Sequence, residues 1–429
     1  MKYAFKNGYV LSGNVDMKPE SGLCVLVSDD KIEAVVPESD ANLDGYEVID
    51  LDGGYLMPGL INPHVHLPVA GNAPKANAKP VDYKKLFKLL AIPGVKAAFK
   101  KMEEGYVRAE VLSGVTTLRA VGGIMDFDGI IRDKIKAGKI AGPRILAANT
   151  AVSVPGGHFA GSLATEAESP EMAREHVRQI HATKPDLIKL MITGGVMDAT
   201  EDGEPGILRM SPDIVAAACD EAHKLGYRVA AHVESPEGVR VALQNGVDTI
   251  EHGAKPDDEI IRLFKERGAA DICTISPALP YCLFDLDVSH TDELGKRNGT
   301  IVMNGIIECA KMCIKEGIPV GIGTDTGCPF IRHYDMWREL IYFVKYCDVT
   351  PTYALYTATK RNAEIIGLGD VTGTIEAGKS ADIIVSSENP LENLKTLKDL
   401  KMVMASGKLY RGQKIKKDEY IDSVLDQYL

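Results

Sequence analysis

Eight short runs of apolar or β-branched residues recur through the middle of this 429-residue chain, and an amphipathic stretch separates most of them. The runs lie at 55–61, 115–121, 145–149, 187–192, 228–233, 247–251, 271–275 and 318–324. Strands that alternate with helices form a parallel sheet, because each helix returns the chain to the start of the next strand. Eight such units close on themselves. The pattern therefore predicts an α/β fold of the (β/α)₈ TIM-barrel type.

Both ends of the chain lack this alternation with helices. They contain short apolar runs such as 24–27, 32–36 and 400–405, which are separated by turn residues. We expect one composite β-sandwich domain formed by residues 1–57 together with 372–429, and a barrel over residues 58–371.

Two connections in the predicted barrel are too long to be simple turns. They span residues 67–98 and 276–298, after the first and seventh predicted strands. Long loops after barrel strands usually cover an active site, although a disordered insertion is the alternative.

The composition limits the class of partner. A net charge of −11 argues against a nucleic acid or an anionic membrane as a partner, so we expect a small-molecule substrate. The chain has neither a secretory signal nor the roughly 18 apolar residues that span a bilayer. Its eight cysteines are scattered without a CxxC pair, as is typical of free thiols in a reducing compartment. These features together predict a cytoplasmic protein.

Side chains that bind metals follow four of the predicted strands or lie at their ends. The active sites of barrel enzymes lie at the carboxyl ends of the strands, and residues two apart on a strand project to the same side. Imidazole and carboxylate groups suit Zn²⁺, and also Mn²⁺, Fe²⁺ or Ni²⁺. The candidate ligands from position alone are His64, His66, His232, His252 and Asp325.

Lys189 is unusual because it lies inside the apolar run 187–192. A buried ammonium group loses hydration and would repel a metal ion. From the residues alone, a lysine that pairs with a carboxylate or extends to solvent is an alternative to a functional lysine.

Several motifs resemble a known family. Residues 58–66 (PGLINPHVH) resemble the first metal motif of the amidohydrolase superfamily, and residues 373–383 are similar to its C-terminal signature. Residues 114–119, 188–196 and 335–340 resemble the prolidase-like (Xaa-Pro dipeptidase) branch, which is related to imidazolonepropionase. The resemblance covers essentially the whole chain.

In that branch the strand-four lysine is carboxylated and bridges two divalent metal ions, for which Zn²⁺ is the expected metal. The resemblance implies one metal bound by His64, His66 and Asp325, the other by His232 and His252, and carboxylated Lys189 bound to both. It implies that a metal-bridging hydroxide cleaves a C–N amide bond in a dipeptide, an N-acyl amino acid or a related small amide. Asp325 would then be the catalytic acid and base. Relatives often form dimers or larger rings, so we expect a homo-oligomer.

Three further residues are candidates for substrate binding. His158 ends a Gly-Gly-His segment similar to one that binds substrate in the family. Glu234 stands where many relatives have an aromatic residue or a histidine, and a carboxylate there favours an amine or a cation in the substrate. Arg119 ends the second predicted strand, and a structural ion pair is the alternative role for it. Relatives commonly carry Arg-Asp there, whereas Ala120 follows here, which weakens a dipeptidase assignment.

Two other functions remain open. A deaminase or a cyclic amide or amidine hydrolase of the imidazolonepropionase type would use the same barrel with one metal. Such relatives usually place a catalytic glutamate three residues after the strand-five histidine, where this chain has Ser235, and they need no lysine on strand four. A non-catalytic barrel that serves as a binding module is the other alternative. About two metals per chain would favour the binuclear amide hydrolase.

Overall fold

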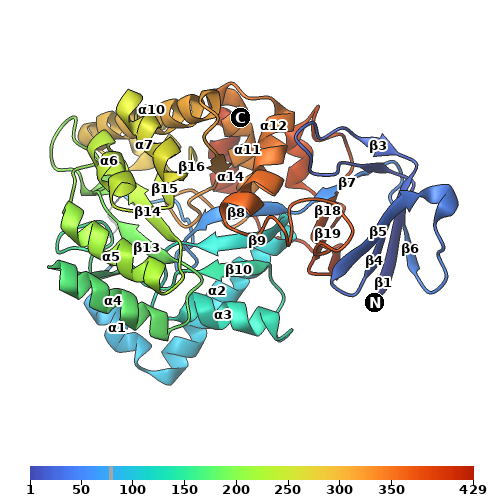
Figure 1. The fold of residues 1–429 in the computed structure, drawn as a ribbon, viewed down its shortest axis with the longest axis horizontal. Coiled ribbons are helices and arrows are strands. Elements are labelled where there is room, and N and C mark those ends of the chain that lie inside the picture. The colour runs from blue at the N-terminus through green and yellow to red at the C-terminus, as the bar shows by residue number, and fades with distance from the viewer. Residues whose placement is uncertain (77–80) are drawn as a thin grey trace.

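The computed structural model describes residues 1–76 and 81–429. Eight parallel strands form the barrel at the centre of the molecule (Figure 1). They are β8 (Leu60–Val65), β9 (Val115–Ala120), β10 (Arg144–Ala147), β13 (Ile188–Met191), β14 (Val229–Val233), β15 (Thr249–His252), β16 (Ala270–Cys273) and β17 (Val320–Ile322). Val65 at the end of β8 forms a parallel bridge with Thr326, which follows β17. The Asp186 amide, just before β13, donates to the carbonyl of Ala147 in β10 at 2.8 Å. These contacts join the sheet edges, so the predicted barrel is confirmed.

Helices surround the barrel and follow its strands (Figure 1). Among them, α2, α4, α5 and α6 begin with a proline in the first turn, where the missing N–H costs no hydrogen bond. The main helices are α2 (Pro93–Leu112), α3 (Phe127–Lys136), α4 (Pro170–Ala182), α5 (Pro212–Lys224), α6 (Pro236–Gln244), α7 (Asp258–Arg267), α10 (Glu293–Lys315) and α11 (Met336–Cys347). Shorter helices are α12 (Pro351–Tyr356), η3 (Thr357–Arg361) and α13 (Asn362–Ile365).

Both long loops contain helices. α1 (Tyr83–Leu90) lies in the first, and α8 (Leu279–Leu283) and α9 (Leu286–Ser289) lie in the second. Part of the first loop, residues 77–80, lies outside the described residues. The helical structure of both loops argues against a disordered insertion in the described segments.

The first apolar run is not one strand, so this detail of the prediction is wrong. β7 (Tyr55–Pro58) pairs antiparallel with β18 (Ile383–Ser386) in the sandwich, whereas β8 begins at Leu60 in the barrel. Gly59 lies at the crossing, and a Cβ added there would lie 2.1 Å from the Thr116 hydroxyl oxygen. The missing side chain allows the chain to pass from one sheet to the other at close range.

The small domain consists of two packed sheets drawn from both ends of the chain (Figure 1). Its core joins residues such as Phe5 and Val25 to Leu56 and Ile383. The predicted composite sandwich is thus confirmed as part of the fold. One sheet has the order β5 (Lys31–Pro37), β4 (Leu23–Ser28), β1 (Lys2–Lys6) and β6 (Glu47–Asp50). The other has the order β20 (Lys408–Arg411), β19 (Met402–Ala405), β18, β7, β2 (Tyr9–Val10) and β3 (Glu20–Ser21).

The last helix, α14 (Glu419–Leu425), packs on the barrel. Arg338 of α11 donates to Asp422 at 3.0 Å and to Asp426 at 2.6 Å, and its guanidinium group is almost completely buried. The domain boundaries remain a prediction. We propose the division at 57/58 and 371/372, with the final helix seated on the barrel.

Two other observations concern the whole described chain. All eight cysteines are free, in agreement with the predicted free thiols. Within residues 1–76 and 81–429, every helix is too short or too polar to cross a membrane.

Candidate metal centre

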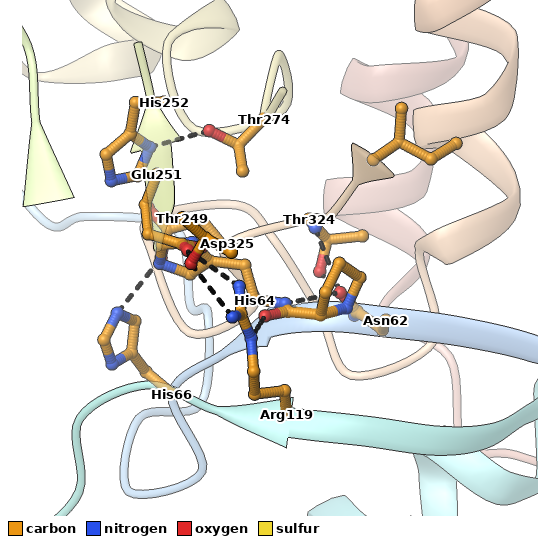
Figure 2. Close-up of polar contacts among 12 residues, drawn as sticks. Asn62, His64, His66, Arg119, Thr249, Glu251, His252, Thr274, Thr324 and Asp325 are labelled. Carbon is orange, nitrogen blue, oxygen red and sulfur yellow. Dashed lines mark hydrogen bonds and ion pairs between the residues drawn. The ribbon is translucent and has the colours of Figure 1, made fainter. Parts of the chain in front are cut away.

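Three donor atoms converge where the first and last barrel strands meet. The Nε2 atoms of His64 and His66 lie 3.4 Å and 3.3 Å from the same Asp325 oxygen, Oδ1 (Figure 2). The Asp325 amide donates to the His64 carbonyl at 3.0 Å, which fixes this register. All three side chains are buried. Two imidazoles and one carboxylate in this arrangement form a three-donor group that can bind a divalent metal.

A second three-donor group lies beside the first. His232 and Glu234 come from β14 and the residue after it, and His252 ends the neighbouring strand β15. The ring centroids of His252 and His64 are 4.9 Å apart, so the two groups adjoin. Lys189, on the next strand β13, lines the same cavity. The structure thus brings together all six residues predicted as metal ligands.

The backbone at two of these residues is strained. His252 has φ +74° and Asp325 has φ +53°, both in the left-handed region that glycine favours. A non-glycine residue held there costs on the order of 1 kcal/mol or more and is common at functional sites. The fold therefore holds these side chains in orientations that an ordinary strand end would not provide.

Glu251 and Arg119 form a buried layer behind His64 (Figure 2). His64 Nδ1 lies 2.8 Å from Glu251 Oε2, while Arg119 donates to Glu251 Oε1 at 2.7 Å. Burial alone would raise the pKa of Glu251, but Arg119 and His64 together hold it below its ordinary value. An ionised carboxylate only accepts hydrogen bonds, so Nδ1 carries the proton and the Nε2 lone pair faces Asp325.

Two of the other histidines are oriented in a similar way. His252 Nδ1 lies 2.7 Å from the Thr274 hydroxyl, and His66 Nδ1 lies 2.9 Å from the Gly122 carbonyl. A partner at one ring nitrogen fixes the direction of the other, as is usual for metal-binding histidines.

The electrostatics of the donors fit a metal ion. Burial lowers the pKa of His64 to about 4 and holds the pKa values of His232 and His252 well below their ordinary range, so these imidazoles are neutral at pH 7. Metal ligands must be deprotonated in this way. Several buried atoms lack a hydrogen-bond partner among the described residues, and a cation would satisfy them. They are His64 Nε2, Glu234 Oε2 and Asp325 Oδ1.

The predicted substrate residues differ in their placement. His158 lines the cavity, where its Nδ1 lies 2.5 Å from Asp198 and its ring stacks on His232 at 4.2 Å. Glu234 lines it too, and burial, with Asp325 and Asp198 nearby, raises the pKa of Glu234 to about 8. Arg119 is buried behind His64 and is absent from the lining formed by the described residues, so we propose for it the structural ion pair.

The cavity has a volume of about 60 Å³, which is smaller than typical sites for drug-sized ligands and suits a small substrate group. Tyr281 and Ala278 come from the loop 276–298, so this loop covers the site as expected. Much of the wall is apolar and includes Phe159, Met191, Met197, Val302 and Ile306.

Sequence reasoning missed three residues at this site. Glu251 is an acid inside an apolar strand next to a predicted ligand, and that burial pattern is a signal that could have found it. Asp198 ends the short helix η2 (Val196–Asp198) after β13, and Cys328 donates its thiol to Asp325 Oδ2 at 3.3 Å. For the latter two, nothing in the local sequence indicates a role.

Comparisons with known proteins agree with this geometry. The sequence pattern of the Amidohydrolase family matches residues 55–410. The chain belongs to the amidohydrolase family. The prediction of an amidohydrolase-family enzyme is therefore confirmed, and the matched range includes all six proposed metal ligands.

Solved structures match along nearly the full length. A Bifidobacterium longum protein proposed to be a prolidase is 34% identical with a TM-score of 0.88, and 99% of this chain and 98% of that one are covered. A Xaa-Pro dipeptidase with methionine bound in its active site is 27% identical with a TM-score of 0.83, and 96% and 100% are covered. The predicted prolidase-like branch is thus supported.

A curated relative is the ochratoxinase of Aspergillus niger, 27% identical over 330 residues. The match covers 70% of this chain and 66% of the length of ochratoxinase.

Proposed function

We propose that this protein is a metal-dependent hydrolase that cleaves a C–N amide bond in a small substrate such as a dipeptide, an N-acyl amino acid or a related amide. The observation that carries the proposal is the convergence of neutral imidazoles and an ionised carboxylate in one cavity at the carboxyl ends of the barrel strands. Solved relatives of the prolidase type support the same reaction class.

The cofactors proposed for the site are two divalent metal ions, most simply Zn²⁺, with carboxylated Lys189. Such ions, when bound, polarise a carbonyl group and lower the pKa of a bound water. Burial lowers the pKa of Lys189 to about 8, so part of this amine is uncharged near neutral pH. A neutral amine is the form that reacts with CO₂, which supports the carbamate.

The chain's own groups supply binding and proton transfer. Asp325 has its Oδ1 toward the two histidines and its Oδ2 toward the Cys328 thiol, and it lines the cavity. We assign to it the transfer of a proton to the leaving amine. We assign substrate binding to His158, whose Nδ1 is engaged by Asp198 and whose second ring nitrogen would contact the substrate. The apolar wall limits access of water.

The charge of the cavity limits the substrate class. Glu234 and Asp198 contribute carboxylates near the site, and the lining formed by described residues contains no arginine. A substrate that places its own carboxylate near Glu234 would meet repulsion. Among the proposed amides, those that place an amine near Glu234 are therefore favoured.

The mononuclear alternative has less support. Its catalytic glutamate would occupy position 235, but Ser235 is the N-cap of α6 and accepts a hydrogen bond from the Gly238 amide at 3.3 Å. A serine committed to this cap cannot act as the acid and base of a deaminase.

The proposal is tested with zinc-loaded protein and a library of dipeptides, N-acyl amino acids and cyclic amides. We expect release of free amine from one or more open-chain amides, and loss of that activity in Asp325→Asn. Turnover confined to cyclic amides or to deamination, with one zinc per chain, would overturn it. A homo-oligomer and a cytoplasmic location stay predictions, and light scattering on the purified protein tests the first.

A further inference from the structure

Glu234 lies next to two of the proposed metal ligands, His232 and His252, a position that a role in substrate binding does not require. It lies two residues after His232, directly after the end of β14, and both side chains line the same cavity. The neighbouring strand is in register, with Val233 opposite His252. One donor atom from each of His232, Glu234 and His252 lies within 4.8 Å of the others.

The local packing confines the Glu234 carboxylate to this position. Its backbone amide donates to the Thr193 hydroxyl at 3.0 Å, which fixes the turn after the strand. A Cβ added to Gly195 would lie 3.2 Å from Glu234 Oε2, so the opposite wall lies close to the carboxylate. Oε2 is buried and has no hydrogen-bond partner among the described residues.

The surroundings of Glu234 also need a positive charge. Its Oε2 atom is buried, and the carboxylate of Asp325 lines the same cavity. Asp198 is engaged by His158, and Asp325 belongs to the first donor group. A divalent ion between His232, His252 and Glu234 would supply the missing counter-charge.

The donor types match this interpretation. Two imidazoles and one carboxylate form a common catalytic zinc set with one open position. The first group, His64 with His66 and Asp325, has the same composition. Each of the two groups therefore offers three donors without any contribution from Lys189.

We propose that Glu234 is a metal ligand, which with His232 and His252 retains the second divalent ion even when Lys189 is not carboxylated. This rests on the proposed function only for the presence of two metals. Each metal site then has three protein ligands of its own, and Lys189 serves only to link the two sites. Glu234 is accordingly a metal ligand and no longer a substrate-binding residue.

The test measures bound zinc by mass spectrometry after Zn²⁺ loading and dialysis. We expect about two zinc ions per chain in the wild type and in Lys189→Ala, and about one in the double variant Lys189→Ala/Glu234→Gln. In a chelator competition, Glu234→Gln alone should weaken the second site at least tenfold. Asp198→Asn is the matched control, because it removes a carboxylate that contacts His158 beside the cavity without removing a member of the donor group.

Two results would overturn the inference. One is loss of the second zinc in Lys189→Ala alone, and the other is wild-type zinc affinity in Glu234→Gln. Glutamine keeps the size of the side chain, and near-ultraviolet circular dichroism verifies that each variant is folded. Zinc retention that depends on Glu234 in a protein without amide hydrolysis would refute the proposed function but leave this ligand in place.

Discussion

The carboxylate of Glu251 accepts a hydrogen bond from His64 Nδ1 at 2.8 Å, in a place where neither side chain meets solvent. The other oxygen of Glu251 is bound by Arg119 at 2.7 Å. A buried ion pair thus fixes the tautomer of a proposed metal ligand, and it does so from strands β9 and β15 on different parts of the barrel.

Removal of Glu251 should therefore affect both folding and metal binding. Glu251→Ala leaves Arg119 as a buried charge without its partner, which should lower the free energy of unfolding by about 3–5 kcal/mol. The freed His64 ring should weaken zinc binding by about 10–100-fold. Urea unfolding and chelator competition measure the two effects. Glu251→Gln still offers an oxygen, so it should lose less stability and less zinc affinity than Glu251→Ala. Equal losses in the two variants would contradict the role of the carboxylate.

Asp325→Asn should separate metal binding from catalysis. The amide oxygen can still face His64 and His66, but the side chain can no longer accept and return a proton. Turnover should fall by about 10²–10⁴-fold while bound zinc is kept. Initial rates and zinc content on the same preparation check this. Near-normal turnover would rule out Asp325 as the acid and base.

Arg338 should be a major stabilising residue outside the site. It contacts Asp335 in its own helix region and binds Asp422 and Asp426 of the C-terminal segment. Arg338→Ala leaves buried carboxylates without their cation. The free energy of unfolding, measured in urea, should therefore fall by about 3–5 kcal/mol. Proteolysis after residue 411 should become faster. The exposed pair Arg297–Asp202 is the control, and Arg297→Ala should change stability by less than about 0.5 kcal/mol.

Glu103 should make stability fall as the pH rises. It is fully buried in α2 without a partner among the described residues, and burial together with the nearby Asp128 raises its pKa. The folded state therefore binds a proton more tightly than the unfolded state. Its contribution is fully present below the ordinary glutamate pKa of 4.5 and is lost as the pH rises toward the raised value.

Glu103→Gln should accordingly raise the free energy of unfolding at pH 8 by on the order of 1 kcal/mol or more, and the gain should shrink toward pH 5. Denaturant unfolding across that range measures it. The neighbouring Glu104 pairs with Lys134 at 2.7 Å and has a lowered pKa, so Glu104→Gln should give no such gain at pH 8. A gain for Glu103→Gln that is the same at both pH values would exclude ionisation as its cause.

Much of the barrel could be predicted because its signal is local. The alternation of apolar runs with amphipathic stretches is a property of neighbouring residues, and the strand order follows from it. The pair His64 and His66 could be placed for the same reason, since residues two apart on a strand share a side. The split of the first run at Gly59 could not, because it depends on Thr116, which is distant in sequence.

By itself, the sequence determined which residues lie at the carboxyl ends of the strands, and therefore which donors are available for a metal. The tertiary structure decided how those donors are grouped and supported. Arg119 and Glu251 are 132 residues apart, and His64 and Glu251 are 187 apart. Such partners are chosen by the register between strands and by barrel closure, which follow from the packing of the whole chain. For that reason only the structure assigned Arg119 to Glu251, and Glu234 to the two histidines of the second donor group.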